Sequence, residues 1–202
     1  MTNPLADQFG DLDIYLFDQL LRGRIAPGMR VFDAGCGGGR NLVYLLRQGC
    51  EVVGCDASPE AIATVRALAA SLAPGRAADF RHEAIEDASF ADASADVVIA
   101  SAVLHFARDD AHFEAMLRAL WRVLKPGGVF LARLASTIGM EGQFQALGQG
   151  RYHLLDGSDR YLVDAATILA WTGRLGGDLL DPLKTTVVHE QRSMTTWVAR
   201  RR

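Results

Sequence analysis

The stretch VFDAGCGGGRN, residues 31–41, places three glycines, Gly35, Gly37 and Gly39, directly after an apolar run. A tight turn between a strand and a helix needs positive φ angles, which glycine adopts without steric cost. Glycine also lets a ligand approach the main chain closely, because no Cβ stands in the way. The stretch therefore predicts a strand, a ligand-binding turn and a helix.

The ligand predicted for this turn has no phosphates. A dinucleotide-binding turn of the form GxGxxG needs a third glycine where this chain has Arg40. A nucleoside triphosphate loop is excluded more firmly, since no Gly-Lys-Ser/Thr sequence follows the glycines.

Outward from the turn, residues 28–133 alternate short apolar runs with amphipathic stretches. This pattern is typical of a parallel sheet with crossover helices. The predicted strands occupy residues 29–34, 50–56, 78–83, 95–103 and 127–135, and the predicted helices residues 40–48, 59–72 and 109–124. An aspartate caps the start of the last helix, and the sequence LKPGG ends it.

Both flanks of this region carry further predicted elements. Before the first strand, two apolar series at helical spacing predict a helix that packs across the sheet edge. Residues 136–162 are Gly-rich and Gln-rich and look like an inserted loop. A helix over 163–171 and a hairpin from TTVVHEQ and MTTWVAR, turning around Arg192 and Ser193, follow. The two N-terminal series are Leu12, Leu16, Leu20 and Ile14, Phe17, Leu21.

Composition and charge narrow the class of protein. A chain of 202 residues, half of them apolar, suffices for the core of one domain. Its net charge of -3, with both signs interspersed, argues against a protein that holds nucleic acid through phosphate contacts. Asp7, Asp11 and Asp13 stand where a secretory signal needs basic and apolar residues. Since no apolar run reaches the roughly 18 to 20 residues of a membrane span, we expect a cytoplasmic protein.

The cysteines predict neither a disulfide framework nor a metal site. Cys36, Cys50 and Cys55 are odd in number and lack the CxxC or histidine-partnered spacing of zinc ligands. We therefore expect free, buried thiols.

The glycine turn and the strand ends resemble the motifs of class I S-adenosylmethionine-dependent methyltransferases of the small, single-domain type. Asp33 and the three glycines match the first motif, an acidic residue followed by GxGxG. Asp56 ends the second strand in VVGCDAS, as does the family's carboxylate that accepts hydrogen bonds from both ribose hydroxyls. HEAIED resembles the adenine-contacting segment, with Glu83 where Asp is usual and Glu86 or Asp87 as alternatives.

The resemblance extends through ADVVIASAVLHF and LRALWRVLKPGGVFLARL and covers about half of the chain. It implies S-adenosylmethionine as cofactor and S-adenosylhomocysteine as product. The cofactor-binding residues that it implies are Asp33, Gly35, Cys36, Gly37, Gly39, Asn41, Asp56, Ala57, Glu83, Ala84, Ser101 and Ala102.

The expected fold is α/β: a Rossmann-like, doubly wound, mostly parallel seven-stranded sheet with an antiparallel C-terminal edge hairpin. We expect one methyltransferase domain over residues 1–202. Its cofactor-binding half would span residues 28–135, and residues 136–202 would form the acceptor-side lid and the hairpin.

Asp33 and Asp56 have a structural alternative, since an aspartate before a helix also serves as its cap. The combination of two acids and a glycine turn favours cofactor binding, because caps do not require such a turn. A noncatalytic module that binds the cofactor remains an alternative to an enzyme, since both would carry these motifs.

His105 is the candidate catalytic residue, because it follows the fourth strand, whose carboxyl end should face the transferred methyl group. A general base is needed only for acceptors that keep their proton at neutral pH, and His105 has the alternative of shaping the pocket floor. SAVL replaces the NPPY or DPPY of enzymes that methylate exocyclic base amines or glutamine, so we expect a small-molecule acceptor. Candidates for the acceptor pocket, or equally for the core, are Tyr15, Phe106, Phe144, Tyr152, His153, Leu154 and Tyr161.

Overall fold

A computed structural model describes residues 4–76 and 78–202. The helices within these ranges are α1 (Pro4–Phe9), α2 (Ile14–Leu21), α3 (Val43–Arg47), α4 (Pro59–Leu72), α5 (Asp110–Val123) and α6 (Ala165–Arg174), with 3-10 turns η1 (Ile85–Asp87) and η2 (Leu104–Phe106). The strands are β1 (Arg30–Ala34), β2 (Glu51–Asp56), β3 (Asp79–His82), β4 (Ala95–Ser101), β5 (Leu124–Ser136), β6 (Gln145–Gly148), β7 (Arg151–His153), β8 (Asp159–Tyr161), β9 (Gly177–Leu179), β10 (Lys184–Val188) and β11 (Arg192–Arg201).

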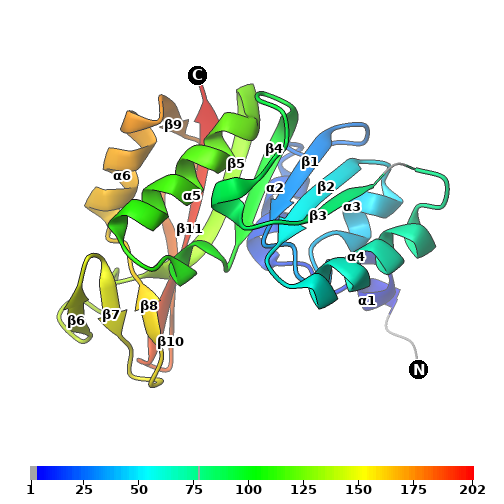
Figure 1. The fold of residues 1–202 in the computed structure, drawn as a ribbon. Helices are drawn as coiled ribbons and strands as arrows, with labels where there is room; N and C mark the ends of the chain where they lie inside the picture. The colour runs from blue at the N-terminus through cyan, green and yellow to red at the C-terminus, as the bar shows by residue number, and fades with distance from the viewer. Residues whose placement is uncertain (1–3, 77) are drawn as a thin grey trace.

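The central sheet has the order β10-β11-β5-β4-β1-β2-β3 (Figure 1). Strands β3, β2, β1, β4 and β5 run parallel, whereas β11 is antiparallel to β5 and β10 is antiparallel to β11. The predicted seven-stranded sheet with an antiparallel C-terminal hairpin is thus confirmed. In the described part of the chain, the short strand β9 adds an eighth member by pairing with β11, which the sequence pattern did not predict.

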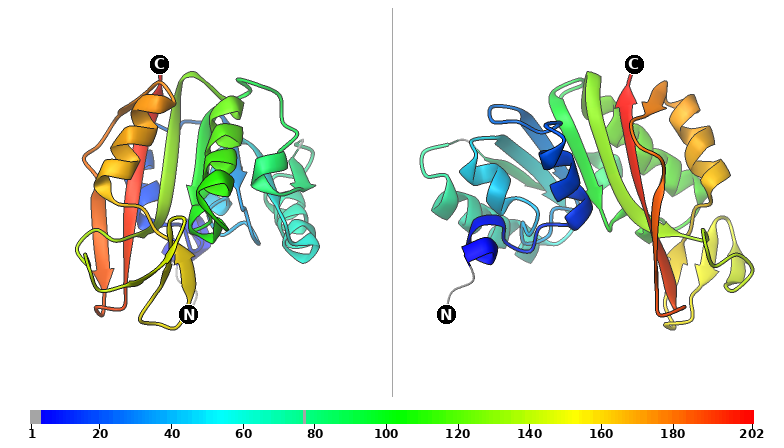
Figure 2. Two further views of the ribbon diagram at one scale, coloured as in Figure 1. Left: turned by 60° about the vertical axis from the view of Figure 1, so that its left-hand side comes forward. Right: turned by 180° about the vertical axis from the view of Figure 1, so that it is seen from behind.

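Helices cover both faces of this sheet, as Figures 1 and 2 show from opposite sides. On one face, Phe113 of α5 and Ile168 of α6 belong to one hydrophobic cluster with the strands. On the other face, Leu16 of α2, Leu45 of α3 and Val65 of α4 belong to a second cluster. Strands buried on both sides read as continuous apolar runs, which is why the sequence reveals them so clearly.

The N-terminal helix lies on a face of the sheet, so the prediction that it packs across the edge was wrong. Leu16 is fully buried against residues of the central strands, including Val31 and Val97. Ile14 and Leu21 of the second apolar series are 68% and 73% exposed. Only one of the two apolar series therefore supplies core contacts.

The predicted helices differ from the observed ones mainly at the glycine turn. Pro59–Leu72 is confirmed as α4, and α5 is capped by Asp109, which accepts a hydrogen bond from the His112 amide at 2.7 Å. The helix predicted from residue 40 begins only at Val43, because residues 39–42 remain part of the turn. The helix predicted over 163–171 begins at Ala165 after its cap Asp164 and runs to Arg174.

Residues 136–162 do not form a structureless loop, which corrects the sequence-based prediction. They contain the antiparallel strands β6, β7 and β8, which form a separate three-stranded sheet. Leu154 and Leu162 anchor it on Ala135 at the end of β5. This small sheet lies beyond the carboxyl edge of the parallel strands, beside the turn of the β10–β11 hairpin (Figures 1 and 2).

The β10–β11 hairpin is confirmed, but its turn lies before the predicted position. Lys184–Val188 pairs with Arg192–Thr196, so residues 189–191 form the connection. His189 and Glu190 adopt positive φ angles there. Among the described residues, no helix has the length and apolar character needed to cross a membrane.

Candidate functional site

The glycine turn is held against the end of β2 by three hydrogen bonds. The amides of Gly35 and Cys36 donate to the Cys55 carbonyl at 2.9 and 3.1 Å. The amide of Gly37 donates to Oδ2 of Asp56 at 2.9 Å. Gly35, Gly37 and Gly39 all have positive φ, at 66°, 52° and 85°, so the three glycines are required where the sequence places them.

Asp56 and Asp33 are not helix caps. Ser58 caps α4, with its hydroxyl accepting from the Ala61 amide at 3.2 Å, and Leu42 precedes α3. Oδ1 of Asp56 accepts from the Ser58 amide at 2.9 Å while Oδ2 holds the glycine turn. The Asp56 carboxylate thus joins two loops at the carboxyl edge, and the capping alternative does not apply.

Two pockets meet at this edge and share Gly35. The first, which we call the glycine pocket, has a volume of about 390 Å³ and includes the turn, Asn41 and Ser101. The second, the Asp56 pocket, has a volume of about 400 Å³ and includes the end of β2 and the loops that follow β3 and β4. Together they bring ten of the twelve predicted cofactor residues into one crevice: Gly35, Cys36, Gly37, Gly39, Asn41, Asp56, Ala57, Ala84, Ser101 and Ala102.

Glu83 does not line either pocket. Its carboxylate accepts a hydrogen bond from the Ser89 amide at 2.9 Å, six residues further along the chain. Glu86 lines the Asp56 pocket instead and accepts a hydrogen bond from His112 at 2.8 Å. Of the acids in HEAIED, Glu86 is therefore the one placed to contact a ligand there, while Asp87 is exposed.

Asp33 lies beneath the crevice, in the middle of the sheet. Its residue is 2% exposed, and burial raises the pKa of its carboxyl to about 7. Arg40 opposes that pKa shift, and the charge of Asp56 adds to it. Near neutral pH the group is thus divided between its acid and its carboxylate form.

This raised pKa predicts a slope in stability with pH. Since folding raises the pKa of Asp33 from 3.8 to about 7, the folded chain holds more protons than the unfolded chain between these values. The contribution of Asp33 to the free energy of unfolding is therefore largest at low pH and is lost as the pH rises to about 7. Asparagine cannot ionise, so Asp33→Asn should reduce the fall in the free energy of unfolding between pH 5 and pH 7.5. Urea denaturation at the two pH values measures this fall. An unchanged difference between these two pH values would contradict the assignment.

A buried aspartate ties the N-terminal segment to the crevice. Oδ2 of Asp13 accepts hydrogen bonds from Ser101 Oγ and Arg133 Nη1, both at 3.2 Å, and lies 3.7 Å from Arg40 Nη2. The Asp13 amide donates to Oδ1 of Asn41 at 3.1 Å. Arg40, which occupies the position of a third glycine, thus joins a polar cluster at the open side of the glycine pocket.

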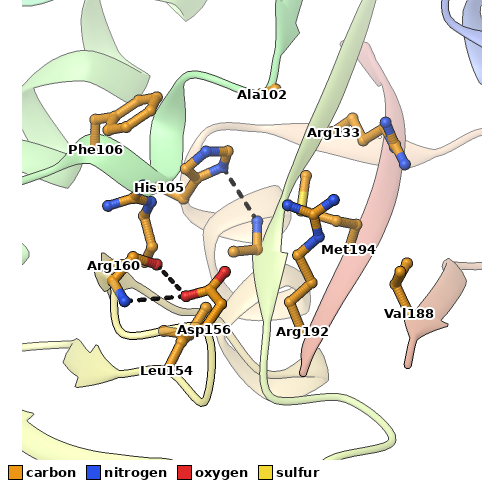
Figure 3. Close-up of a pocket in the computed structure, with 12 residues that line it drawn as sticks. Ala102, His105, Phe106, Arg133, Leu154, Asp156, Arg160, Val188, Arg192 and Met194 are labelled. Carbon is orange, nitrogen blue, oxygen red and sulfur yellow. Dashed lines mark hydrogen bonds between the residues drawn. The ribbon is translucent and has the colours of Figure 1, made fainter. Parts of the chain in front are cut away.

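A third cavity, which we call the arginine pocket (Figure 3), shares the lining residues Ala102 and Phe106 with the Asp56 pocket. Its volume is about 360 Å³. Ala102 stands at the junction with a positive φ of 61°. The pocket is lined by Ala102, His105, Phe106, Arg133, Ala135, Leu154, Asp156, Ser158, Arg160, Val188, Arg192 and Met194.

His105 lies in the wall of the arginine pocket and is neutral at pH 7. Burial lowers the pKa of His105 most, and the charges of Arg160, Arg133 and Arg192 contribute to the same shift, which brings that pKa to about 4. Its Nδ1 accepts from the Ala135 amide at 3.4 Å, the bond drawn in Figure 3. The ring proton therefore resides on Nε2, so His105 offers a hydrogen-bond donor.

Of the other predicted acceptor-side residues, Phe106 and Leu154 line the arginine pocket. Phe144 and Tyr152 pack against the small cluster around Leu154. Tyr161 belongs to the core, where it stacks on an aromatic ring.

Two further candidates are engaged elsewhere. His153 is exposed and pairs with Asp159 at 2.7 Å. The Tyr15 hydroxyl lies 2.6 Å from that of Thr186. Neither lines the arginine pocket.

Sequence reasoning missed the charged residues of the arginine pocket. Arg160 and Arg192 come from the segment 136–202, where no periodic pattern marks them. Arg133 had a detectable signal, because it is a charged residue within the apolar run VFLARLA. The three cysteines are free and buried, as predicted.

Comparison with known proteins identifies the family to which this chain is similar. The family described as "Methyltransferase domain" matches residues 32–132. An uncharacterised methyltransferase of Synechocystis is 39% identical over 108 residues, which cover 52% of this chain and 47% of that protein. The ubiquinone biosynthesis O-methyltransferase of Xanthomonas campestris is 32% identical over 155 residues, covering 72% of this chain and 61% of the relative. The chain thus spans between about half and three fifths of the length of these curated relatives.

A solved structure supports the same fold. The magnesium protoporphyrin IX methyltransferase from Synechocystis, with bound S-adenosylmethionine, superposes with a TM-score of 0.70 at 21% identity, covering 94% of this chain and 77% of that chain. The family match spans half of the chain and contains the glycine turn, Asp56 and the end of β4. The chain therefore belongs to the methyltransferase domain family and has the Rossmann-like fold of its S-adenosylmethionine-dependent members.

Proposed function

We propose that the chain transfers a methyl group from S-adenosylmethionine to a small-molecule acceptor by in-line displacement. The observation that carries this proposal is a row of three neighbouring pockets at the carboxyl edge of the sheet, each sharing lining residues with the next. Two of them contain ten of the twelve residues that the family resemblance assigns to the cofactor. The third opens from them at Ala102 and Phe106, where an acceptor would meet the methyl group.

The residues of the crevice fit this cofactor. The Asp56 carboxylate has lone pairs beyond those used by the Gly37 and Ser58 amides, so it can still accept from two ribose hydroxyls. Glu86 and the apolar Ile85 and Val103 lie in the same pocket and suit the adenine. A homocysteine moiety fits along the exposed main chain of the glycine turn.

The bound cofactor supplies a sulfonium methyl group whose thioether leaving group departs without a charge. The chain's own residues have the task of aligning the acceptor with the methyl group. Holding the acceptor in line at about 3 to 3.5 Å from the methyl carbon lowers the activation barrier by several kcal/mol. Segment 136–202 encloses the acceptor side with the β7–β8 connection and the β10–β11 hairpin, which limits the access of water. We propose that His105 orients the acceptor through its Nε2 proton.

Substitution at His105 separates this role from that of a general base. His105→Ala should lower kcat by about tenfold or more, the effect of losing one hydrogen bond, with the affinity for S-adenosylhomocysteine unchanged. His105→Gln places an amide donor near the position of Nε2 and should keep most of the rate. Steady-state kinetics with both variants tests this. Equal losses in His105→Ala and His105→Gln would favour a base instead.

The proposal is tested by measuring binding and transfer separately. S-adenosylhomocysteine should raise the melting temperature of the purified chain, and NAD should leave it unchanged. Labelled methyl groups from S-adenosylmethionine should then appear in the small-molecule fraction of a cell lysate. Absence of both effects would refute the proposal. Binding without transfer into any fraction would leave the noncatalytic module as the function.

A further inference from the structure

The arginine pocket gathers three guanidinium groups around His105. Arg133 comes from β5, Arg160 from β8 and Arg192 from the start of β11, so distant parts of the chain bring the same charge to one cavity. All three act electrostatically on the same buried imidazole. Figure 3 shows their side chains around the cavity, with Asp156 as the acidic residue among those drawn.

Asp156 interacts electrostatically with Arg160 and Arg192, but it forms no close ion pair with either within the described residues. Its Oδ1 accepts from the amide and the hydroxyl of Ser158 at 3.0 and 2.6 Å. These hydrogen bonds lower the pKa of Asp156, so it carries its charge at neutral pH. No ion pair within 4 Å joins Asp156 to an arginine in the described part of the chain.

The arginines retain unused hydrogen-bond donors. Arg133 gives Nη1 to Asp13 at 3.2 Å, but its buried Nε has no partner among the described residues. Arg160 donates one bond, from Nη1 to the Asp159 carbonyl at 2.8 Å, and its guanidinium lies 4.9 Å from the centre of the Phe106 ring. For Arg192, residues 4–76 and 78–202 provide no side-chain hydrogen bond or ion pair to its guanidinium.

The charges in and beside the pocket do not balance. Among the residues that line the pocket, three arginines face one carboxylate, that of Asp156. Even when the ion pair of Arg133 with Asp13 is counted, one positive charge has no matching negative charge. Arg40 also lies within ion-pair distance of Asp13, so Asp13 compensates Arg133 only in part and the excess of positive charge is larger. Arg192 is exposed and Arg160 is partly buried, so water can reach their donors while the pocket is empty. A neutral or cationic acceptor would cover these guanidinium donors without supplying partners for them, which is unfavourable.

Apart from His105 and Ser158, the rest of the wall is apolar. Phe106, Leu154, Val188 and Met194 line the cavity between the arginines. A guanidinium fork matches the paired oxygens of a carboxylate or phosphate, while apolar walls suit a hydrocarbon body. The pocket therefore combines a positively charged end with a surface for an aromatic or aliphatic group.

We propose that the methyl acceptor is an organic anion, with an apolar body and a carboxylate or phosphate group held by Arg192 and Arg160 beside Arg133. This inference rests on the proposed function, since it assigns the arginine pocket to the acceptor. It names the chemical class of the acceptor and the residues that select it.

The test compares anionic probes with neutral counterparts that carry the same apolar body, on the chain saturated with S-adenosylhomocysteine. The pairs are 4-hydroxybenzoate with 4-hydroxybenzamide, hexanoate with hexanamide, and phenyl phosphate with phenol. Titration calorimetry should show that at least one anion binds about tenfold more tightly than its neutral partner, as expected for one charge-assisted hydrogen bond. Preference in the first two pairs identifies a carboxylate, and preference in the third alone identifies a phosphate.

Substitutions of the pocket arginines test whether the preference for anionic probes comes from the arginine pocket. Arg192→Gln and Arg160→Gln should each reduce it severalfold while leaving the affinity for S-adenosylhomocysteine unchanged. Arg47→Gln, an exposed arginine on α3, serves as the matched control and should change neither quantity. Equal binding within every pair, no binding by any anion, or a preference that survives both variants would overturn the inference. Failure of S-adenosylhomocysteine itself to bind would instead count against the proposed function.

Discussion

Asp56→Ala is expected to weaken binding of S-adenosylmethionine by about tenfold to a hundredfold, which corresponds to about 1.5 to 3 kcal/mol of charge-assisted hydrogen bonding. The substitution removes the proposed acceptor for the ribose hydroxyls. It also removes the partner of the Gly37 and Ser58 amides, both held at 2.9 Å. The glycine turn therefore loses an anchor together with the ligand contact.

Titration calorimetry with S-adenosylhomocysteine measures this loss without turnover. Asp178→Ala is a suitable control, because Asp178 is an exposed aspartate on β9, outside the three pockets. Circular dichroism should show that both variants retain the fold. An affinity within twofold of the unmodified chain in Asp56→Ala would remove Asp56 from the cofactor site.

Gly35→Ala is expected to damage both the fold and the cofactor site. Gly35 has a φ of 66°, and a Cβ there would lie 2.5 Å from Cγ2 of Val103. A left-handed conformation costs an alanine about 1 to 2 kcal/mol, and the steric overlap adds about 1 to 3 kcal/mol. We therefore expect the melting temperature to fall by about 5 to 15 °C and the affinity for S-adenosylhomocysteine to fall with it.

Gly28→Ala separates the two contributions. Gly28 has a similar φ of 82°, but among the described residues beyond its two chain neighbours no heavy atom lies within 4 Å of its added Cβ. It should therefore show only the conformational cost, as measured by differential scanning calorimetry, with ligand affinity unchanged. Equal losses of stability in Gly28→Ala and Gly35→Ala would show that contact with Val103 has no part in the effect.

The crevice at the glycine turn was predictable because the residues that form it are close in sequence. The glycine turn follows a buried strand, and Asp56 ends the next one, so parallel pairing alone brings them together. Main-chain hydrogen bonds at the ends of strands then fix their geometry, whatever lies elsewhere in the chain. The pattern of apolar runs was enough to place these residues at one edge.

Glu83 shows where such reasoning stops. It follows β3 in the expected way, yet Ser89 engages its carboxylate. Glu86 lines the Asp56 pocket in place of Glu83, because a hydrogen bond from His112 on α5 orients its carboxylate. A sequence motif identifies the segment, but competition between nearby partners decides which acid lines the pocket.

The arginine pocket was not predictable because its residues meet only through tertiary packing. Strands β6, β7 and β8 have three or four residues each, too few for an apolar alternation to appear. Arg160 and Arg192 belong to different sheets and face the same cavity only when the small sheet and the hairpin lie side by side. No spacing between residues 160 and 192 encodes that meeting.

A crystal structure of the chain with S-adenosylhomocysteine tests the central claim most directly. We predict the ribose hydroxyls within hydrogen-bond distance of the Asp56 carboxylate, the adenine beside Glu86 and the homocysteine along the glycine turn. The sulfur should face the junction of the pockets at Ala102. Ligand density elsewhere on the chain, or an Asp56 carboxylate without contact to the ribose, would contradict the account.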